Sequence, residues 1–169
     1  MRLRLRARRG NSVEGLKARS NWLRLRISSD LVAEKGVPLL HKRTRWSVET
    51  AGWRLEDDGE VVSLTPCDVD AALQLSTHLK SVGIVGDAEL RRMSDLASPS
   101  GPPRVFVQCG EFGGYTTSYI SDSKYWRVWW LAKDDLHIYA TYNCNPDRVG
   151  QRDDVVTWIL GSLRRAHTP

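Results

Sequence analysis

The feature that most constrains the fold of this chain is an aromatic stretch in its second half, KYWRVWWLAKDDLHIYATYNC, from Lys124 to Cys144. It contains two runs of β-forming residues, separated by Lys133, Asp134 and Asp135. Two such runs joined by a short polar segment predict a β-hairpin. Successive side chains of a strand point to opposite faces, so the length of the loop decides which aromatic rings share a face.

We expect a three-residue loop over 133–135, which places Ala132 opposite Leu136. The alternation then gives one face without charge, which we assign to the core and which includes Trp126 and Trp130. A two-residue loop would instead bring charged and polar side chains into the apolar faces. Burial of each large side chain contributes roughly 1.5–3 kcal/mol, which favours the core assignment over a stacking platform.

The other face of this hairpin carries the candidate partner-binding site, which consists of Arg127, Trp129, Tyr139 and His137. These side chains combine an apolar floor with polar tips, as in an aromatic anchor for a peptide or a partner protein. The alternative is that the C-terminal helix covers Trp129 and Leu131, with Arg127 and His137 at the rim.

Several shorter β-like runs accompany the hairpin, over 44–49, 52–57, 60–66, 104–110 and 115–121. An Asp-Gly pair at Asp58-Gly59 predicts a second hairpin. Residues 69–80 alternate between apolar and polar, which favours a strand with one wet face, although Asp68 as a helix N-cap leaves a helix open. The glycines of CGEFGGY lie between two β runs, so they predict a bulge or bend and not a phosphate-binding loop.

Two segments have helical periodicity, over 86–98 and 152–165. Asp87 can cap the first helix. Arg164 and Arg165 would match the dipole at the end of the second. We therefore predict an α+β domain with a single twisted, mostly antiparallel sheet of about six to seven strands and helices packed on its faces (α/β/α).

The net charge of +5 is distributed unevenly along the chain. Residues 1–26 hold nine basic residues and one acidic residue, a net of +8, so the remainder carries −3. We expect residues 1–20 to be a basic, disordered arm and residues 21–169 to be one domain. The arm could bind nucleic acid through its arginines, and this alternative rests on Arg2, Arg4, Arg6, Arg8 and Arg9.

Motifs that would indicate catalysis, a metal or a cofactor do not occur in the sequence. The odd number of widely spaced cysteines fits buried thiols in a reducing compartment, and no apolar run is long enough to span a membrane, so we expect a cytoplasmic protein. A catalytic dyad of Cys109 with His137 or His78 stays open, as does an enzyme without a known motif. We expect no cofactor and no metal.

Residues from about Ala71 to Leu163 resemble the PsbP-like α/β/α family. The resemblance rests on AALQLSTHLK, on a helix, on the aromatic hairpin and on a closing helix that ends ILGSLRR. It implies a twisted antiparallel sheet with helices on both faces, and a role in binding or chaperoning other proteins. The first hypothesis is therefore a non-catalytic bacterial protein-binding domain, such as an immunity or effector-chaperone protein, whose partner is another protein.

Overall fold

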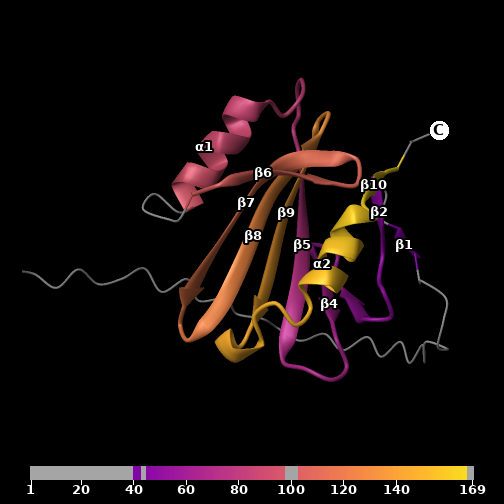
Figure 1. Cartoon of the computed structure of the whole chain (residues 1–169). Coiled ribbons are helices and arrows are strands. Elements are labelled where there is room, and N and C mark those ends of the chain that lie inside the picture. Colours follow the sequence, from indigo (N-terminus) through magenta and orange to yellow (C-terminus); the bar gives the residue numbers. More distant parts are fainter. Residues whose placement is uncertain (1–39, 43–44, 98–102, 167–169) are drawn as a thin grey trace, which may run out of the picture. The chain divides into compact units, whose positions relative to one another are not determined.

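A seven-stranded antiparallel sheet dominates the computed structural model, which describes residues 40–42, 45–97 and 103–166 (Figure 1). Its strand order is β3-β4-β5-β9-β8-β7-β6. The strands are β3 (Arg54–Asp57), β4 (Val61–Thr65), β5 (Ala71–Leu79), β6 (Val105–Cys109), β7 (Phe112–Ser121), β8 (Lys124–Lys133) and β9 (Leu136–Cys144). The predicted antiparallel α+β architecture is confirmed, and the alternating segment that could have been a helix is strand β5.

The prediction of a single sheet was wrong, because a second, three-stranded sheet lies beside the large one. It has the order β1-β2-β10 and consists of β1 (Leu40–Lys42), β2 (Trp46–Glu49) and β10 (Arg164–Arg165). Arg164 and Arg165 were predicted to end a helix, and this was wrong. They pair with β2 instead, and the carboxylate of Asp135 holds the Arg165 guanidinium at 2.5 Å. Helical periodicity in the preceding residues could not reveal this long-range pairing.

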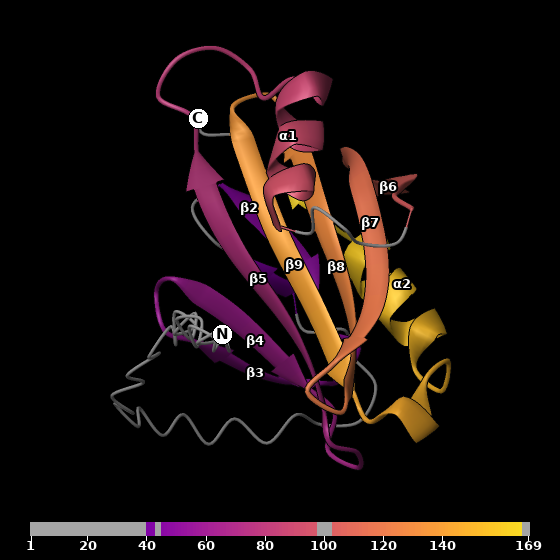
Figure 2. The same ribbon diagram turned by 90° about the vertical axis from the view of Figure 1, so that its left-hand side faces the viewer.

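The two helices lie on opposite faces of the large sheet (Figures 1 and 2). Helix α1 (Asp87–Ala97) connects β5 to β6 and packs on β7 and β8. Helix α2 (Asp153–Gly161) follows a short 3-10 turn, η1 (Pro146–Arg148), and packs against β6 and β2. No helix in the described parts of the chain is long and apolar enough to cross a bilayer.

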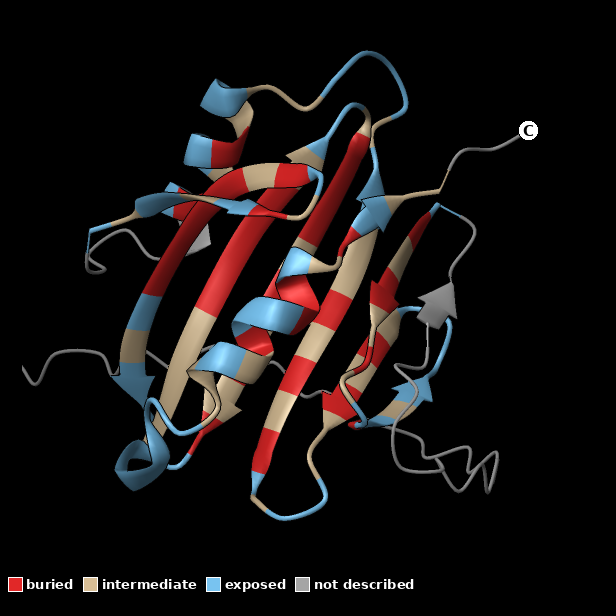
Figure 3. Ribbon diagram, turned by 45° about the vertical axis from the view of Figure 1, so that its right-hand side comes forward, coloured by how far each residue is buried: buried red, intermediate tan, exposed pale blue. Residues whose placement is uncertain are grey.

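The main hydrophobic core lies on the face that carries α2, where buried and less buried residues alternate along β5 and β9 (Figure 3). The small sheet closes the same core, since Trp46 is fully buried there and its indole N–H donates to Thr77 Oγ1 at 2.8 Å. Fully buried members from both sheets and from α2 include Leu64, Leu73, Leu75, Leu131, Ile138, Ile159 and Leu160.

Two of the glycines in CGEFGGY are required by close approaches of the backbone. Gly110 lies in the turn between β6 and β7 with φ 60°, and a Cβ there would lie 2.1 Å from the carbonyl oxygen of Leu163. A Cβ at Gly114 would lie 1.9 Å from the carbonyl oxygen of Trp130. Gly110 therefore lets the β6–β7 turn approach Leu163, and Gly114 lets β7 approach β8 closely. Neither glycine lies at the start of a helix.

Candidate binding site

The hairpin between β8 and β9 has a two-residue loop, Asp134-Asp135, so the predicted three-residue loop was wrong. Lys133 pairs with Leu136. Asp134 adopts φ 56°, the left-handed conformation that tight two-residue hairpins use and that aspartate tolerates better than most residues. The difference of one residue moves every side chain of β9 to the opposite face relative to β8.

The four predicted partner-binding residues therefore do not share a surface. Arg127 and Trp129 point to the face of α2, and His137 and Tyr139 point to the face of α1. Trp129 is only 3% exposed and belongs to the main core, with the Arg127 guanidinium 5.1 Å from its ring centroid. Arg127 also lies 3.9 Å from Asp153 of α2. The alternative interpretation is therefore right for Trp129 and Leu131, which share the core with α2, and wrong for His137, which is buried on the opposite face and not at the rim.

The two tryptophans predicted in the core differ in burial. Trp130 is buried in a small cluster with Leu90 of α1, Tyr115 and Val128. Trp126 points to the same face but is only half-buried, and its indole N–H donates to the carbonyl oxygen of Ser121 at 3.3 Å. The face of α1 is therefore a core at one end and a more open surface at the other.

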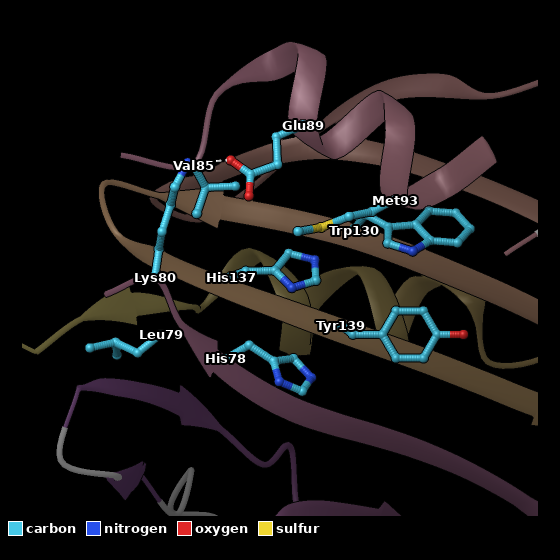
Figure 4. Close-up of a pocket in the computed structure, with 9 residues that line it drawn as sticks. All are labelled: His78, Leu79, Lys80, Val85, Glu89, Met93, Trp130, His137 and Tyr139. Atoms are coloured by element: carbon cyan, nitrogen blue, oxygen red, sulfur yellow. Dashed lines mark hydrogen bonds and ion pairs between the residues drawn. The ribbon is translucent and has the colours of Figure 1, made fainter. Parts of the chain in front are cut away.

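A pocket of about 470 Å³ lies between α1 and this face of the sheet (Figure 4). Its residues come from the end of β5 and the following loop, from α1, and from β8 and β9. Val85, Met93, Trp130 and Tyr139 contribute apolar walls, and the rings of Trp130 and Tyr139 lie 5.8 Å apart at 47°. Such a pocket can hold a ring-sized group.

Two histidines lie side by side in this pocket. His78 on β5 pairs directly with His137 on β9, and their rings stack at 5.9 Å with an angle of 25°. His137 is 6% exposed. Burial, and to a lesser extent the neighbouring His78, lowers the pKa of His137 from 6.5 to about 4, so its imidazole is neutral at pH 7. Its Nε2 atom is buried and has no hydrogen-bond partner among the residues that the structure describes.

An ion pair lies at the edge of the same pocket. Lys80 Nζ lies 2.5 Å from Glu89 Oε2 and also donates to the carbonyl oxygen of Ile84 at 3.0 Å. The hydrogen bond from Lys80 lowers the pKa of the Glu89 carboxyl. The two charges therefore neutralise each other, and the pair connects α1 to the end of β5.

Helix α1 is held over the pocket by polar contacts with the sheet. The Tyr115 hydroxyl donates to Asp87 Oδ1 at 2.5 Å, and this hydrogen bond is the main cause that lowers the pKa of Asp87. Arg91 binds the other carboxylate oxygen of Asp87 at 2.8 Å and lies 5.1 Å from the centroid of the Tyr115 ring. Asp87, predicted as a helix cap, thus anchors the helix to β7.

The loop before α1 is also fixed by the β8–β9 hairpin. The backbone N–H of Lys80 donates to the carbonyl oxygen of Asp135 at 2.9 Å, and that of Val85 donates to the carbonyl oxygen of Asp134 at 2.7 Å. The two-residue loop therefore has a structural role beyond the register, because its carbonyl groups position one wall of the pocket.

The dyad of Cys109 with a histidine, which the sequence left open as an alternative, does not form. Cys109 lies on β6, on the face of α2, and β7 and β8 separate it from β9, a distance of about 14 Å at ordinary strand spacing. Burial raises the pKa of the Cys109 thiol to about 11, which removes its nucleophilic form at neutral pH. Cys144 is also buried, but Cys67 is exposed, so the expectation of buried thiols holds for two of the three cysteines.

Two other sequence-based interpretations concern metal and nucleic acid. The described residues contain no group of three or more His, Cys, Asp or Glu side chains that could hold a metal ion. The arginines of the alternative nucleic-acid site, which are Arg2, Arg4, Arg6, Arg8 and Arg9, all lie outside the described residues.

Sequence reasoning found part of this pocket and missed the rest. His137 and Tyr139 were selected for a binding site, and His78 was named only as a possible catalytic partner of Cys109. Lys80 and Glu89 were not selected. The alternation of β5 did place His78 on the wet face of that strand, which was a usable signal. The approach of Glu89 depends on how α1 packs on the sheet, and no local pattern encodes it.

No family model matches the sequence, and no curated protein matches it. A crystal structure of a protein from Bacteroides thetaiotaomicron VPI-5482, at 1.50 Å resolution, is similar to this chain, with a TM-score of 0.53 and 13% sequence identity. The superposition covers 72% of this chain and 45% of that protein, so this chain matches less than half of its length. At this level of identity the similarity concerns the fold alone.

Proposed function

We propose that this chain is a non-catalytic protein-binding domain, of the immunity or effector-chaperone type found in bacteria, and that it binds its partner on the sheet face that carries α1. The proposal includes the PsbP-like resemblance of the second half of the chain, with a three-layer α/β/α arrangement as its framework. It moves the binding surface away from Arg127 and Trp129, which are covered by α2 or lie beside it.

The observation that carries the proposal is a set of half-buried aromatic side chains on the α1 face, Tyr119, Trp126 and Tyr139. Helix α1 crosses only one end of this face, and neither helix covers the lower parts of β5, β9, β8 and β7 (Figure 2). Tyrosine and tryptophan are enriched where proteins bind each other, because each combines a large apolar surface with a polar atom.

The chemistry of the pocket favours binding over catalysis. His78, His137, Lys80 and Glu89 do bring titratable groups together, as an enzyme would require. However, the charges of Lys80 and Glu89 are paired with each other. His137, with its pKa lowered to about 4, is a weak base at neutral pH.

Site-specific photocrosslinking in cells tests the proposal. The photoreactive amino acid p-benzoyl-L-phenylalanine is placed at Trp126 and, as a matched control, at Trp158, which is 47% exposed on α2. We expect position 126 to form a covalent adduct with one defined protein, and position 158 to form none. Equal labelling from both positions, or labelling from position 158 alone, would contradict the proposed surface.

A second candidate function, nucleic-acid binding, is favoured by the charge of the N-terminal segment. Residues 1–26 carry a net of +8, and the rest of the chain is slightly acidic. Titration of the full chain with single-stranded RNA and duplex DNA at increasing salt is the test. The logarithm of the binding constant should fall linearly with the logarithm of the salt concentration, with a slope of roughly 0.7–0.9 per phosphate contact. Replacement of Arg2, Arg4, Arg6, Arg8 and Arg9 by glutamine should remove this slope.

A further inference from the structure

We propose that the pocket between α1 and the sheet binds a neutral aromatic ring that carries a hydroxyl group, and that Nε2 of His137 is the hydrogen-bonding partner of this hydroxyl. The inference goes beyond the proposed function, because it names a ligand chemistry that can be tested on the isolated chain without any partner protein.

The polar requirement of the site comes from His137. This side chain is more than nine-tenths buried, and its Nε2 atom has no hydrogen-bond partner in the described part of the chain. A buried polar atom left without a partner costs about 1–3 kcal/mol, so a ligand that supplies one gains affinity. Figure 4 shows the imidazole between Met93 and Trp130 on one side and His78 and Tyr139 on the other, within the pocket.

The remaining walls favour a flat ring. The ring centroids of Trp130 and Tyr139 lie 5.8 Å apart, so the two rings form one aromatic wall, and Met93 lies beside Trp130 (Figure 4). Ring edges and faces attract another aromatic ring, and methionine sulfur makes favourable contacts with rings. The volume of about 470 Å³ also lies in the range of sites that hold small ligands.

The charges around the pocket favour a neutral ligand. Lys80 and Glu89 are already paired at 2.5 Å, so neither offers a free charge to an ionic group. Transfer of an unpaired charge to this mostly apolar site would be costly. The imidazole of His137 is neutral as well, because burial lowers its pKa to about 4.

A hydroxyl group fits this site whichever tautomer His137 adopts. A neutral imidazole has one N–H donor and one acceptor nitrogen, and a hydroxyl can both donate and accept. A carboxylate could only accept and would bring a charge. The same chemistry can come from a free phenolic compound or from a tyrosine side chain of a partner protein.

Binding of p-cresol and toluene to the full chain tests the inference, because the two probes differ by one hydroxyl group. Binding is followed by amide chemical shifts in two-dimensional NMR. We expect p-cresol to shift residues of the pocket and to bind roughly tenfold more tightly than toluene, as one satisfied buried hydrogen bond would give. The ¹⁵N signal of His137 Nε2 should move with p-cresol and stay in place with toluene.

The variant His137→Phe removes the hydrogen-bonding atom and keeps a ring. It should bind p-cresol and toluene with about equal affinity. Trp158→Phe on the opposite face is the matched control and should keep the preference. Equal binding of both probes to the wild-type chain, or no shift in the pocket with either, would overturn the inference. The wild-type comparison decides the outcome even if His137→Phe fails to fold.

N-acetyl-tyrosinamide distinguishes the two sources of the ligand. If the natural ligand is a partner's tyrosine, N-acetyl-tyrosinamide should bind at least as tightly as p-cresol. If it is a free phenolic compound, N-acetyl-tyrosinamide should bind more weakly than p-cresol, because its backbone groups would not fit. Both results support a hydroxyl-bearing ring.

If the probes fail while crosslinking from position 126 succeeds, this inference falls and the proposed function stands. The reverse pattern would leave the pocket as a ligand site and remove the protein-binding surface.

Discussion

The two faces of the large sheet differ in how they are closed. The α2 face is covered by a helix and by a second sheet, and its core extends from β4 to β6. Among the residues that the structure describes, α1 is the one element that covers the other face, mainly over β7 and β8. The contacts of this helix include the polar group of Tyr115, Asp87 and Arg91. The comparison points to a difference between the faces. One face supplies most of the buried core, and the other, on which we propose that a partner binds, keeps partly exposed rings, a pocket and a buried histidine.

The largest effect that this comparison predicts comes from Trp129→Ala. Because Trp129 is almost fully buried on the α2 face, we expect the free energy of unfolding to fall by about 3–5 kcal/mol. The matched variant Trp126→Ala, on the half-open end of the other face, should cost no more than about 1 kcal/mol. Urea denaturation of both variants checks this contrast, and similar losses would mean that the two faces do not differ in their contribution.

A smaller effect should follow from the pH dependence of stability. In the unfolded chain His137 takes up a proton near pH 6.5, whereas in the folded chain it does so only near pH 4. As the pH falls from about 6.5 to 4, the unfolded state therefore gains protons and the free energy of unfolding decreases, by about 3 kcal/mol for this group alone. Glu89 and His78 also act on this titration.

Urea denaturation between pH 7 and pH 4.5 measures this loss. The variant His137→Phe should show a flatter pH profile, because it no longer buries a titratable group at this position. An unchanged profile in the variant would show that burial of His137 is not the cause.

The smallest effect concerns the attachment of α1. Tyr115→Phe removes the hydroxyl that donates to Asp87 at 2.5 Å, while the ring stays in place. We expect faster amide hydrogen exchange in α1 and unchanged exchange in α2, since α2 packs on the other face. Equal acceleration in both helices would indicate that the two faces open together.

The strands and helices were largely predictable, because their signals are local. The alternation in β5, the Asp-Gly turn between β3 and β4, and the stripe of α1 each lie within one segment. The register of the aromatic hairpin was not predictable from the sequence, since Asp134 and Asp135 fit a two-residue loop and a three-residue loop almost equally well. The wrong choice placed Trp129 and His137 on the same face, although the structure separates them.

Side-chain periodicity and turn chemistry are properties of neighbouring residues, so the sequence by itself determined an antiparallel sheet with two helices. Only the tertiary structure decided that Arg164 and Arg165 pair with β2, that His78 stacks on His137, and that Glu89 meets Lys80. Each of these contacts joins segments whose approach depends on how whole elements pack. The free energy that selects that packing comes from burial over both faces of the sheet, which no short stretch of sequence contains.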